Sequence, residues 1–267
     1  MTHAADRKTI FITGAGSGIG RATAKLFAER GWFVGLFDVN ADGIIGTQKL
    51  LPAGTHMSGV FDVRDREGWR NAVSQFADAT RGRLHVLFNN AGVGRHGWFE
   101  DVSHDDADWT IDVNVKGVVN GIYTALPLLR QTPGARIVNT ASAAGLVGAP
   151  QLAVYSATKF AVRGLSEALD VEFSRYGVRV VCLMPSFIET PILDMPTGGR
   201  NSVLRDQINA TKAPVEPVEV AAQAAWDAVH GDAVHVTAGK MAKRLHFAAR
   251  IFPNGLRKRL IADLPKD

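Results

Sequence analysis

The chain has 267 residues and a formal net charge of +4, with 46% hydrophobic and 21% charged residues. This balance is typical of a globular protein and excludes a disordered or fibrous chain. No apolar run approaches the length of a membrane span, and a Gly-rich stretch follows the N-terminus too soon for a signal peptide, so we expect a cytoplasmic protein.

Short β-branched or apolar runs alternate along the chain with segments of helical length. The runs cover residues 9–13, 33–37, 56–61, 84–89, 136–140, 178–184 and 233–237, and the helical segments cover 18–30, 41–51, 66–80, 105–129, 152–176 and 217–230. Continuous apolar strands joined by helices indicate right-handed crossovers between parallel strands. The pattern predicts one α/β domain over 1–267, a doubly wound Rossmann-type parallel sheet of about seven strands with helices on both faces.

The first run ends in a glycine-rich turn that opens the first helical segment. Glycines let the backbone approach a pyrophosphate, and the helix N-terminus offers free N–H groups and a positive dipole end. The spacing differs from the usual Rossmann G-x-G-x-x-G, but its place between a strand and a helix favours a phosphate cradle over an ordinary turn. The residues expected to form it are Gly14, Ser17, Gly18, Ile19 and Gly20.

Asp38 ends the second run, where an acidic side chain accepts hydrogen bonds from the two adenosine ribose hydroxyls. A 2′-phosphate there would be repelled, and no Lys or Arg stands at 16, 17, 39 or 40 to attract one. The sequence therefore favours NAD(H) over NADP(H). The alternative role for Asp38 is the N-cap of the helix that begins at Ala41.

Further motifs in the same order and spacing make the chain resemble the short-chain dehydrogenase/reductase family, from Lys8 to about Thr237. The resemblance implies an adenine contact at Asp62 and Val63, a strand-end motif at Asn90, Ala91 and Gly92, and a catalytic set of Asn114, Ser142, Tyr155 and Lys159. Each motif is weak alone, but together they are highly specific. We predict no metal site.

Tyr155 and Lys159 stand four residues apart, so they share one helix face. A free tyrosine is a poor base at neutral pH, and a nearby ammonium group is needed to stabilise its phenolate form. We expect Tyr155 to exchange the substrate's hydroxyl proton as general acid or base while Ser142 hydrogen-bonds the substrate oxygen. The resemblance further implies that Lys159 binds the nicotinamide ribose and that Asn114 fixes a bend and a water molecule.

The sixth strand is expected to lead into the nicotinamide side of the site. The resemblance implies cofactor contacts at Pro185, Ile188 and Thr190, but the family's usual Pro-Gly is Pro185-Ser186 here. The backbone contacts can survive if Ser186 adopts a φ that L-residues allow.

Residues 185–217 contain five prolines and no clear element, so we predict a substrate lid there. By the same resemblance, the substrate pocket is lined by residues 93–99, 143–152 and 187–195, which are largely apolar and suit a lipophilic alcohol or ketone. Arg95 and His96 could bind an acidic group, although such loop residues are more often exposed to solvent.

The positive charge is concentrated near the C-terminus. Residues 233–262 hold seven Lys or Arg and no Asp or Glu, while the rest of the chain is slightly acidic, so no nucleic-acid partner is expected. We predict a basic amphipathic extension over 239–267, with Met241, Leu245, Ala248 and Phe252 on one helical face. Such a segment can lie on an anionic membrane, cap a lipophilic pocket or pack at a subunit interface, of which the last is favoured.

These patterns predict an NAD(H)-dependent oxidoreductase that interconverts a secondary alcohol and a ketone, with NAD as cofactor. The alternatives are a non-catalytic NAD(H)-binding regulatory or scaffold protein of the same fold, and a reductase of carbohydrates or acyl thioesters. Family habit also implies a homo-oligomer, a dimer or tetramer, in which the helical segments 105–129 and 152–176 pair across two-fold axes.

Overall fold

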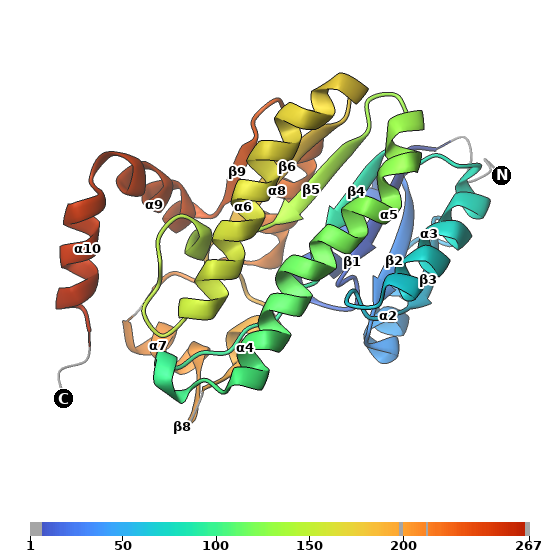
Figure 1. Cartoon of the computed structure of the whole chain (residues 1–267). Coiled ribbons are helices and arrows are strands. Elements are labelled where there is room, and N and C mark those ends of the chain that lie inside the picture. The colour runs from blue at the N-terminus through green and yellow to red at the C-terminus, as the bar shows by residue number, and fades with distance from the viewer. Residues whose placement is uncertain (1–6, 198–199, 212, 265–267) are drawn as a thin grey trace.

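The computed structural model describes residues 7–197, 200–211 and 213–264. At its centre lies a sheet of seven parallel strands in the order β3-β2-β1-β4-β5-β6-β9, covered by helices on both faces (Figure 1). This confirms the predicted doubly wound sheet, and the strand ends differ from the prediction by one or two residues. The strands are β1 (Thr9–Thr13), β2 (Phe33–Asp38), β3 (His56–Val60), β4 (Val86–Asn89), β5 (Arg136–Thr140), β6 (Arg179–Pro185) and β9 (His235–Ala238).

Two hydrophobic clusters, one on each face of the sheet, form most of the core. Helices α1 (Gly18–Glu29), α2 (Ala41–Gln48) and α8 (Val218–His230) cover one cluster, and α3 (Arg66–Thr80), α5 (Gly117–Gln131) and α6 (Ala153–Phe173) cover the other. Strand β1 serves both, because Ile10 and Ile12 point into the first cluster and Phe11 into the second. A strand buried on both faces reads as a continuous apolar run.

The segment predicted as one helix over 105–129 contains a change of helical pitch. Helix α4 (His104–Ile111) passes into a π-helical segment, Asp112–Lys116, and then into α5. Asn114 lies in the middle of the π-helical segment. Such segments recur at functional sites because the extra residue redirects side chains within a helix.

The expectation that residues 185–217 lack regular structure is wrong. They contain a 3₁₀ turn (Pro191–Asp194), the two-stranded hairpin of β7 (Pro196–Thr197) and β8 (Arg200–Val203), and α7 (Leu204–Thr211). These short elements hold together because Leu193, Met195, Leu204 and Ile208 pack with Leu152 in a separate small apolar cluster. Its role as a lid stays a prediction.

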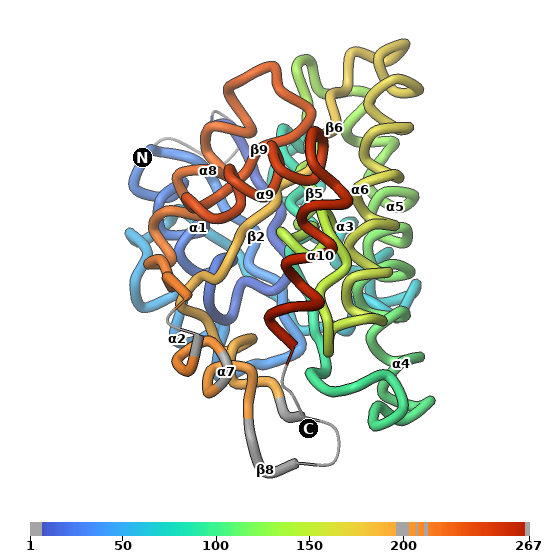
Figure 2. The backbone as a smooth tube through the Cα atoms, turned by 90° about the vertical axis from the view of Figure 1, so that its left-hand side faces the viewer, coloured from blue at the N-terminus to red at the C-terminus, as the bar shows by residue number. Residues whose placement is uncertain are grey.

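The C-terminal extension forms two helices, α9 (Lys240–Ile251) and α10 (Pro253–Ala262). In Figure 2, α9 lies at the β9 edge of the sheet and α10 continues from it in front of the body. Residues 265–267, the end of the predicted extension, lie outside the described residues. No helix within the described ranges is long and apolar enough to cross a membrane.

Candidate active site

The strand order reverses between β1 and β4, so the connections that follow these strands leave in opposite directions and open a crevice at the carboxyl edge of the sheet. A cavity of about 700 Å³ lies there. All predicted site residues line it except Gly20 and Asn114, which lie directly behind it. The lining set comprises Gly14, Ser17, Gly18, Ile19, Asp38, Asp62, Val63, Asn90, Ala91, Gly92, Ser142, Tyr155, Lys159, Pro185, Ile188 and Thr190.

The glycine-rich turn places the N-terminus of α1 against the cavity. Gly14 has φ +67°, and a Cβ there would lie 2.9 Å from Cα of Ala91. A Cβ on Gly20 would overlap the carbonyl oxygen of Gly14. Ser17 caps α1 through its backbone only, so its hydroxyl remains available to a ligand. The close approach and the free helix terminus fit a pyrophosphate group.

Asp38 is fixed by backbone N–H groups on both carboxylate oxygens. Gly16 N donates to Oδ2 at 2.8 Å and Asn40 N donates to Oδ1 at 2.9 Å. The N-cap of α2 is Asn40, whose side chain accepts from Gly43 N at 3.0 Å, so the alternative role of Asp38 as that cap is excluded. The carboxylate is thereby held at the cavity wall, ready to accept hydroxyl groups.

Asp62 and Val63 line the same end of the cavity. Arg64 pairs with Asp62 at 2.6 Å, and the hydrogen bond from its guanidinium lowers the pKa of the Asp62 carboxyl. Trp69 Nε1 donates to the carbonyl oxygen of Val63 at 2.9 Å, which fixes the backbone at this position.

The turn after β4 is tied to β1. The Thr13 hydroxyl accepts from the backbone N–H groups of Asn90 and Ala91, each at 3.1 Å, and the Asn90 side chain donates back to the carbonyl oxygens of Thr13 and Gly14. These bonds join the two strands on either side of the crevice. The turn is therefore held rigidly against the glycine-rich loop.

Ser142, Tyr155 and Lys159 converge on the cavity from β5 and α6. Ser142 follows β5, and Tyr155 and Lys159 stand one turn apart at the start of α6. Lys159 Nζ donates to the carbonyl oxygen of Thr140 at 3.0 Å and lies 5.4 Å from the centre of the Tyr155 ring. The three side chains thus line the same cavity.

Burial shifts the pKa values of Tyr155 and Lys159 in opposite directions. It raises the pKa of Tyr155 to about 12, although a hydrogen bond with Ser142 opposes the rise. It lowers the pKa of Lys159 to about 8, because the ammonium form loses its hydration. Without a bound cofactor the phenol is therefore protonated at neutral pH, and most of Lys159 is charged.

Asn114 connects the turn after β4 to α6. Its Oδ1 accepts from Val93 N, its Nδ2 donates to the Val93 carbonyl oxygen, both at 2.9 Å, and Nδ2 also donates to the Thr158 hydroxyl at 3.1 Å. A Cβ on Gly92 would lie 3.4 Å from both Asn114 Oδ1 and Lys159 Nζ. Asn114 is therefore a buried neighbour of Lys159. Its own side chain does not line the cavity.

The nicotinamide side of the site accommodates Ser186. Only Arg81 and Gln151 have a positive φ among the described non-glycine residues, so Ser186 keeps an ordinary backbone. Its N–H and hydroxyl both donate to the Ala238 carbonyl oxygen, at 2.9 and 3.2 Å. Thr190 donates to the carbonyl oxygen of Ile188 at 3.1 Å, and a Cβ on Gly18 would lie 2.9 Å from its Cγ2.

The substrate side of the cavity differs in part from the prediction. None of residues 143–152 lines it, because Leu152 packs under Leu193 and Met195 instead. Arg95 lines the cavity but pairs with Asp106 at 2.8 Å and lies 4.5 Å from the Trp109 ring centre, while His96 is buried. An acidic substrate would therefore compete with Asp106 for Arg95.

Sequence reasoning missed several residues that shape the site. Trp109 and Val113 line the cavity, and their i, i+4 spacing on the helix that carries Asn114 was the available signal. Thr158, which accepts a hydrogen bond from Asn114, lies inside the motif Tyr155–Lys159 and could have been noted as one of its two aliphatic hydroxyl residues, with Ser156. Nothing in the sequence indicated Arg64.

The comparisons with known proteins agree with this geometry. The short chain dehydrogenase family matches residues 8–197, and the chain belongs to this family of oxidoreductases, whose members bind a nicotinamide dinucleotide. A putative oxidoreductase, SadH, of Mycobacterium tuberculosis is 34% identical over 97% of this chain and 96% of its own.

Two further relatives bear on the site. Cyclohexanol dehydrogenase of an Acinetobacter species is 35% identical over 72% of this chain and 78% of its own. The crystal structure of a short chain dehydrogenase/reductase from Burkholderia phymatum in complex with NAD has a TM-score of 0.82 and 30% identity, covering 100% of this chain and 99% of that one.

Proposed function

We propose that this protein interconverts a secondary alcohol and a ketone with NAD(H), on a lipophilic substrate, and that Tyr155 is the general acid or base. The observation that carries the proposal is the convergence of Ser142, Tyr155 and Lys159 on one cavity, beside a glycine-rich helix N-terminus. Phosphate-binding backbone and proton-transfer side chains thus share one crevice.

The residues present fit a nicotinamide dinucleotide. A bound NAD or NADH supplies the acceptor or donor of the hydride. The N-terminus of α1 and the Ser17 hydroxyl would hold its pyrophosphate, Asp62 and Val63 its adenine end, and Thr190 its carboxamide. Asp38 supports NAD over NADP because its carboxylate already faces the cavity between two N–H donors and would repel a 2′-phosphate.

The proton moves between the substrate oxygen and the Tyr155 hydroxyl. In alcohol oxidation the carbinol carbon gives up a hydride, the hydroxyl proton passes to the phenolate oxygen of Tyr155, and the C–O bond becomes C=O. Ser142 hydrogen-bonds the same oxygen, and the positive charge of Lys159 lowers the free energy of the phenolate. Asn114 holds the turn after β4 against α6 and so keeps Lys159 in place.

Apolar side chains that line the cavity support a lipophilic substrate. They are Trp109, Val113, Ile192, Leu193 and Met195. The name of the Acinetobacter relative, cyclohexanol dehydrogenase, points to the same substrate class. A sugar or an acyl thioester would offer polar groups that these side chains cannot satisfy, which weighs against the carbohydrate and acyl-thioester alternatives.

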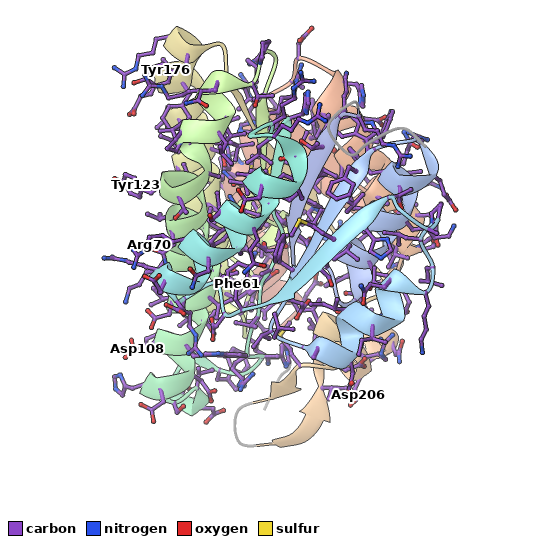
Figure 3. The ribbon with its side chains drawn as sticks, turned by 90° about the vertical axis from the view of Figure 1, so that its right-hand side faces the viewer. Phe61, Arg70, Asp108, Tyr123, Tyr176 and Asp206 are labelled. Atoms are coloured by element: carbon purple, nitrogen blue, oxygen red, sulfur yellow. The ribbon has the colours of Figure 1, made fainter. Side chains whose placement is uncertain are left out.

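We also propose that the protein is a cytoplasmic homo-oligomer. The outward faces of α5 and α6 expose Tyr123 and Val171 to about three quarters of their surface, at 77% and 74%. Figure 3 shows Tyr123 directed away from α5 and the body. Large apolar side chains on neighbouring helices favour burial against a second copy.

The test is steady-state turnover with a panel of cyclic and long-chain secondary alcohols, a sugar alcohol and an acyl thioester, each with NAD(H) and with NADP(H). We expect turnover of the lipophilic alcohols with NAD and at least tenfold lower kcat/KM with NADP. A protein that binds NADH but turns over no member of the panel would be the non-catalytic alternative, and the proposal would fail.

A further inference from the structure

The C-terminal extension attaches to the body through one face of α9. Glu216 Oε1 accepts from Lys240 N at 2.6 Å, Ala242 is buried, and Leu245 packs against the main core on the α5 and α6 side. The His246 ring lies 5.6 Å from that of His235 on β9. The predicted apolar face is thus largely used inside the molecule, since Met241, Leu245 and Ala248 are partly buried there.

A second apolar set faces solvent. Phe247 and Ile251 stand one turn apart on the adjoining face of α9, and Phe252, which was predicted to lie on the internal face, is exposed after them. These three side chains are 66%, 51% and 61% exposed, and Ile261 on α10 is 50% exposed. No residue of α10 is buried, and Figure 1 shows this helix standing clear of the sheet and its covering helices. We call this set, with the cations beside it, the tail surface.

Positive charge predominates around these apolar groups. Lys240, Lys243, Arg244 and Arg250 lie on the exposed side of α9, and 257–259 add three more cations on α10. Within the described residues, Arg259 alone among these seven forms a side-chain ion pair, with Asp263 at 3.8 Å. From 240 to 262 the chain has no carboxylate.

A second copy of this face is a poor partner for the tail surface. A two-fold interface places the same patch against itself, which would bring the cations of α9 against their own copies with no carboxylate to offset them. An anionic bilayer complements both the positive charge and the exposed apolar side chains of the tail surface. Its headgroups attract Lys and Arg, and its acyl boundary takes up Phe and Ile from a helix that lies in the interface.

From this geometry we infer that the tail surface binds the surface of an anionic lipid bilayer. Helix α9 would lie along the membrane with Phe247 and Ile251 directed into it and its cations at the headgroups. Glu216 joins the start of α9 to the end of the segment 185–217, so the bound bilayer would lie near the lid side of the cavity. The inference does not depend on which substrate is turned over.

The test is co-sedimentation of the full-length protein with vesicles of phosphatidylcholine, with and without phosphatidylglycerol. We expect binding to the anionic vesicles only, and its loss when the salt concentration is raised. The variant R250S/I251S should partition at least about tenfold less, because one cation at an anionic surface accounts for about fivefold and the loss of Ile adds to it.

The matched control is K49S/L50S, which removes an exposed cation and an exposed apolar side chain just after α2. It should sediment like the wild type, and the thermal midpoints of both variants should show that the sheet is folded. Wild-type protein that stays in the supernatant, or equal sedimentation of R250S/I251S, would overturn the inference. So would a fall in oligomer mass of R250S/I251S without lipid, since the tail surface would then join two copies.

Discussion

At the scale of single residues, the site depends on two charged side chains, Asp38 and Lys159, that make very few hydrogen bonds within the protein. Asp38 is fixed by two backbone N–H donors and faces the cavity with no cation paired to it among the described residues. Lys159 is buried and donates to one carbonyl oxygen. Both arrangements leave capacity for a ligand, and both can be tested by substitutions that keep the side-chain size.

Asp38→Asn should weaken NADH binding by about ten- to a hundredfold, because a hydrogen bond to a charged group contributes about 1.5–3 kcal/mol. NADPH binding should be affected much less, since the repulsion of its phosphate also disappears. Fluorescence titrations with NADH and with NADPH measure the two dissociation constants. Asp42→Asn, on the exposed first turn of α2, is the control, and equal NADH affinity of D38N and wild type would contradict the role of Asp38.

Lys159→Met should stabilise the fold at neutral pH while it removes turnover. The folded pKa of about 8 lies below the ordinary 10.5, so the unfolded chain binds more protons, and the stability associated with this group is present above 10.5 and lost as the pH falls through 8. At pH 7 we expect a gain of about 1–3 kcal/mol, or about 2–4 °C in Tm for each kcal/mol.

The pH dependence distinguishes this cause from a general packing effect. The difference in Tm between Lys159→Met and wild type should shrink as the pH rises from 8 to 10.5, because the lysine is then neutral in both states. Calorimetry across this range measures it. A constant or growing difference would show that the burial of charge at Lys159 is not what the substitution relieves.

At the scale of elements, Arg205 on α7 links this helix to the stretch that follows β6 within residues 185–217. It pairs with Asp194 at 2.6 Å and with Glu189 at 2.7 Å, and these hydrogen bonds raise its pKa. Asp194 and the neighbouring Leu193 and Met195 line the cavity. The position of this segment over the site therefore depends in part on one guanidinium group.

Arg205→Met should raise the KM of the alcohol substrate by about two- to tenfold with a smaller change in kcat, since ion pairs exposed to solvent make only a modest contribution to holding a segment in place. The same variant should be cut faster by a protease within 189–211. Arg70→Met, which removes a similar pair with Glu67 on α3, serves as control. Unchanged KM and proteolysis would indicate that Arg205 does not hold the lid.

The elements show which structural features the sequence could predict. Strands such as β1 are buried on both faces, so their continuous apolar runs identified them, although the order of the strands in the sheet was not predicted. The hairpin and helix within 185–217 escaped prediction because they are short and rely on contact with Leu152. The family resemblance implied a bend at Asn114, but its π-helical form was not predicted, since the side-chain hydrogen bonds of Asn114 to Val93 and Thr158 depend on tertiary neighbours.

The site was predicted more completely than its surroundings. Gly14 and Asp38 stand at strand ends, where parallel topology alone brings them to one crevice. Residues 143–152 were placed in the pocket by analogy, and the packing of Leu193 and Met195 on Leu152 could not be read from the sequence. The sequence predicted the internal face of α9 that carries Met241 and Leu245. It did not predict the exposed apolar side chains of Phe247 and Ile251.

At the scale of the whole molecule, we expect copies to associate through α5 and α6. Val171→Glu places a charge on the exposed face of α6, and about a two-fold axis it would meet its own copy, so the oligomer should dissociate. Light scattering measures the mass. Leu50→Glu, at a similarly exposed apolar position after α2, should leave the mass unchanged, and a Val171→Glu oligomer of wild-type mass would place the interface elsewhere.

The fold, the cavity and the proton-transfer groups lead us to expect that Tyr155 exchanges the substrate proton during NAD-linked oxidation of an alcohol. The most direct measurement compares wild type and Tyr155→Phe for NADH formation from a turned-over secondary alcohol, with NADH affinity determined on the same samples. We expect Tyr155→Phe to lose at least about a hundredfold in kcat with NADH affinity nearly unchanged. Wild-type turnover by Tyr155→Phe would contradict it.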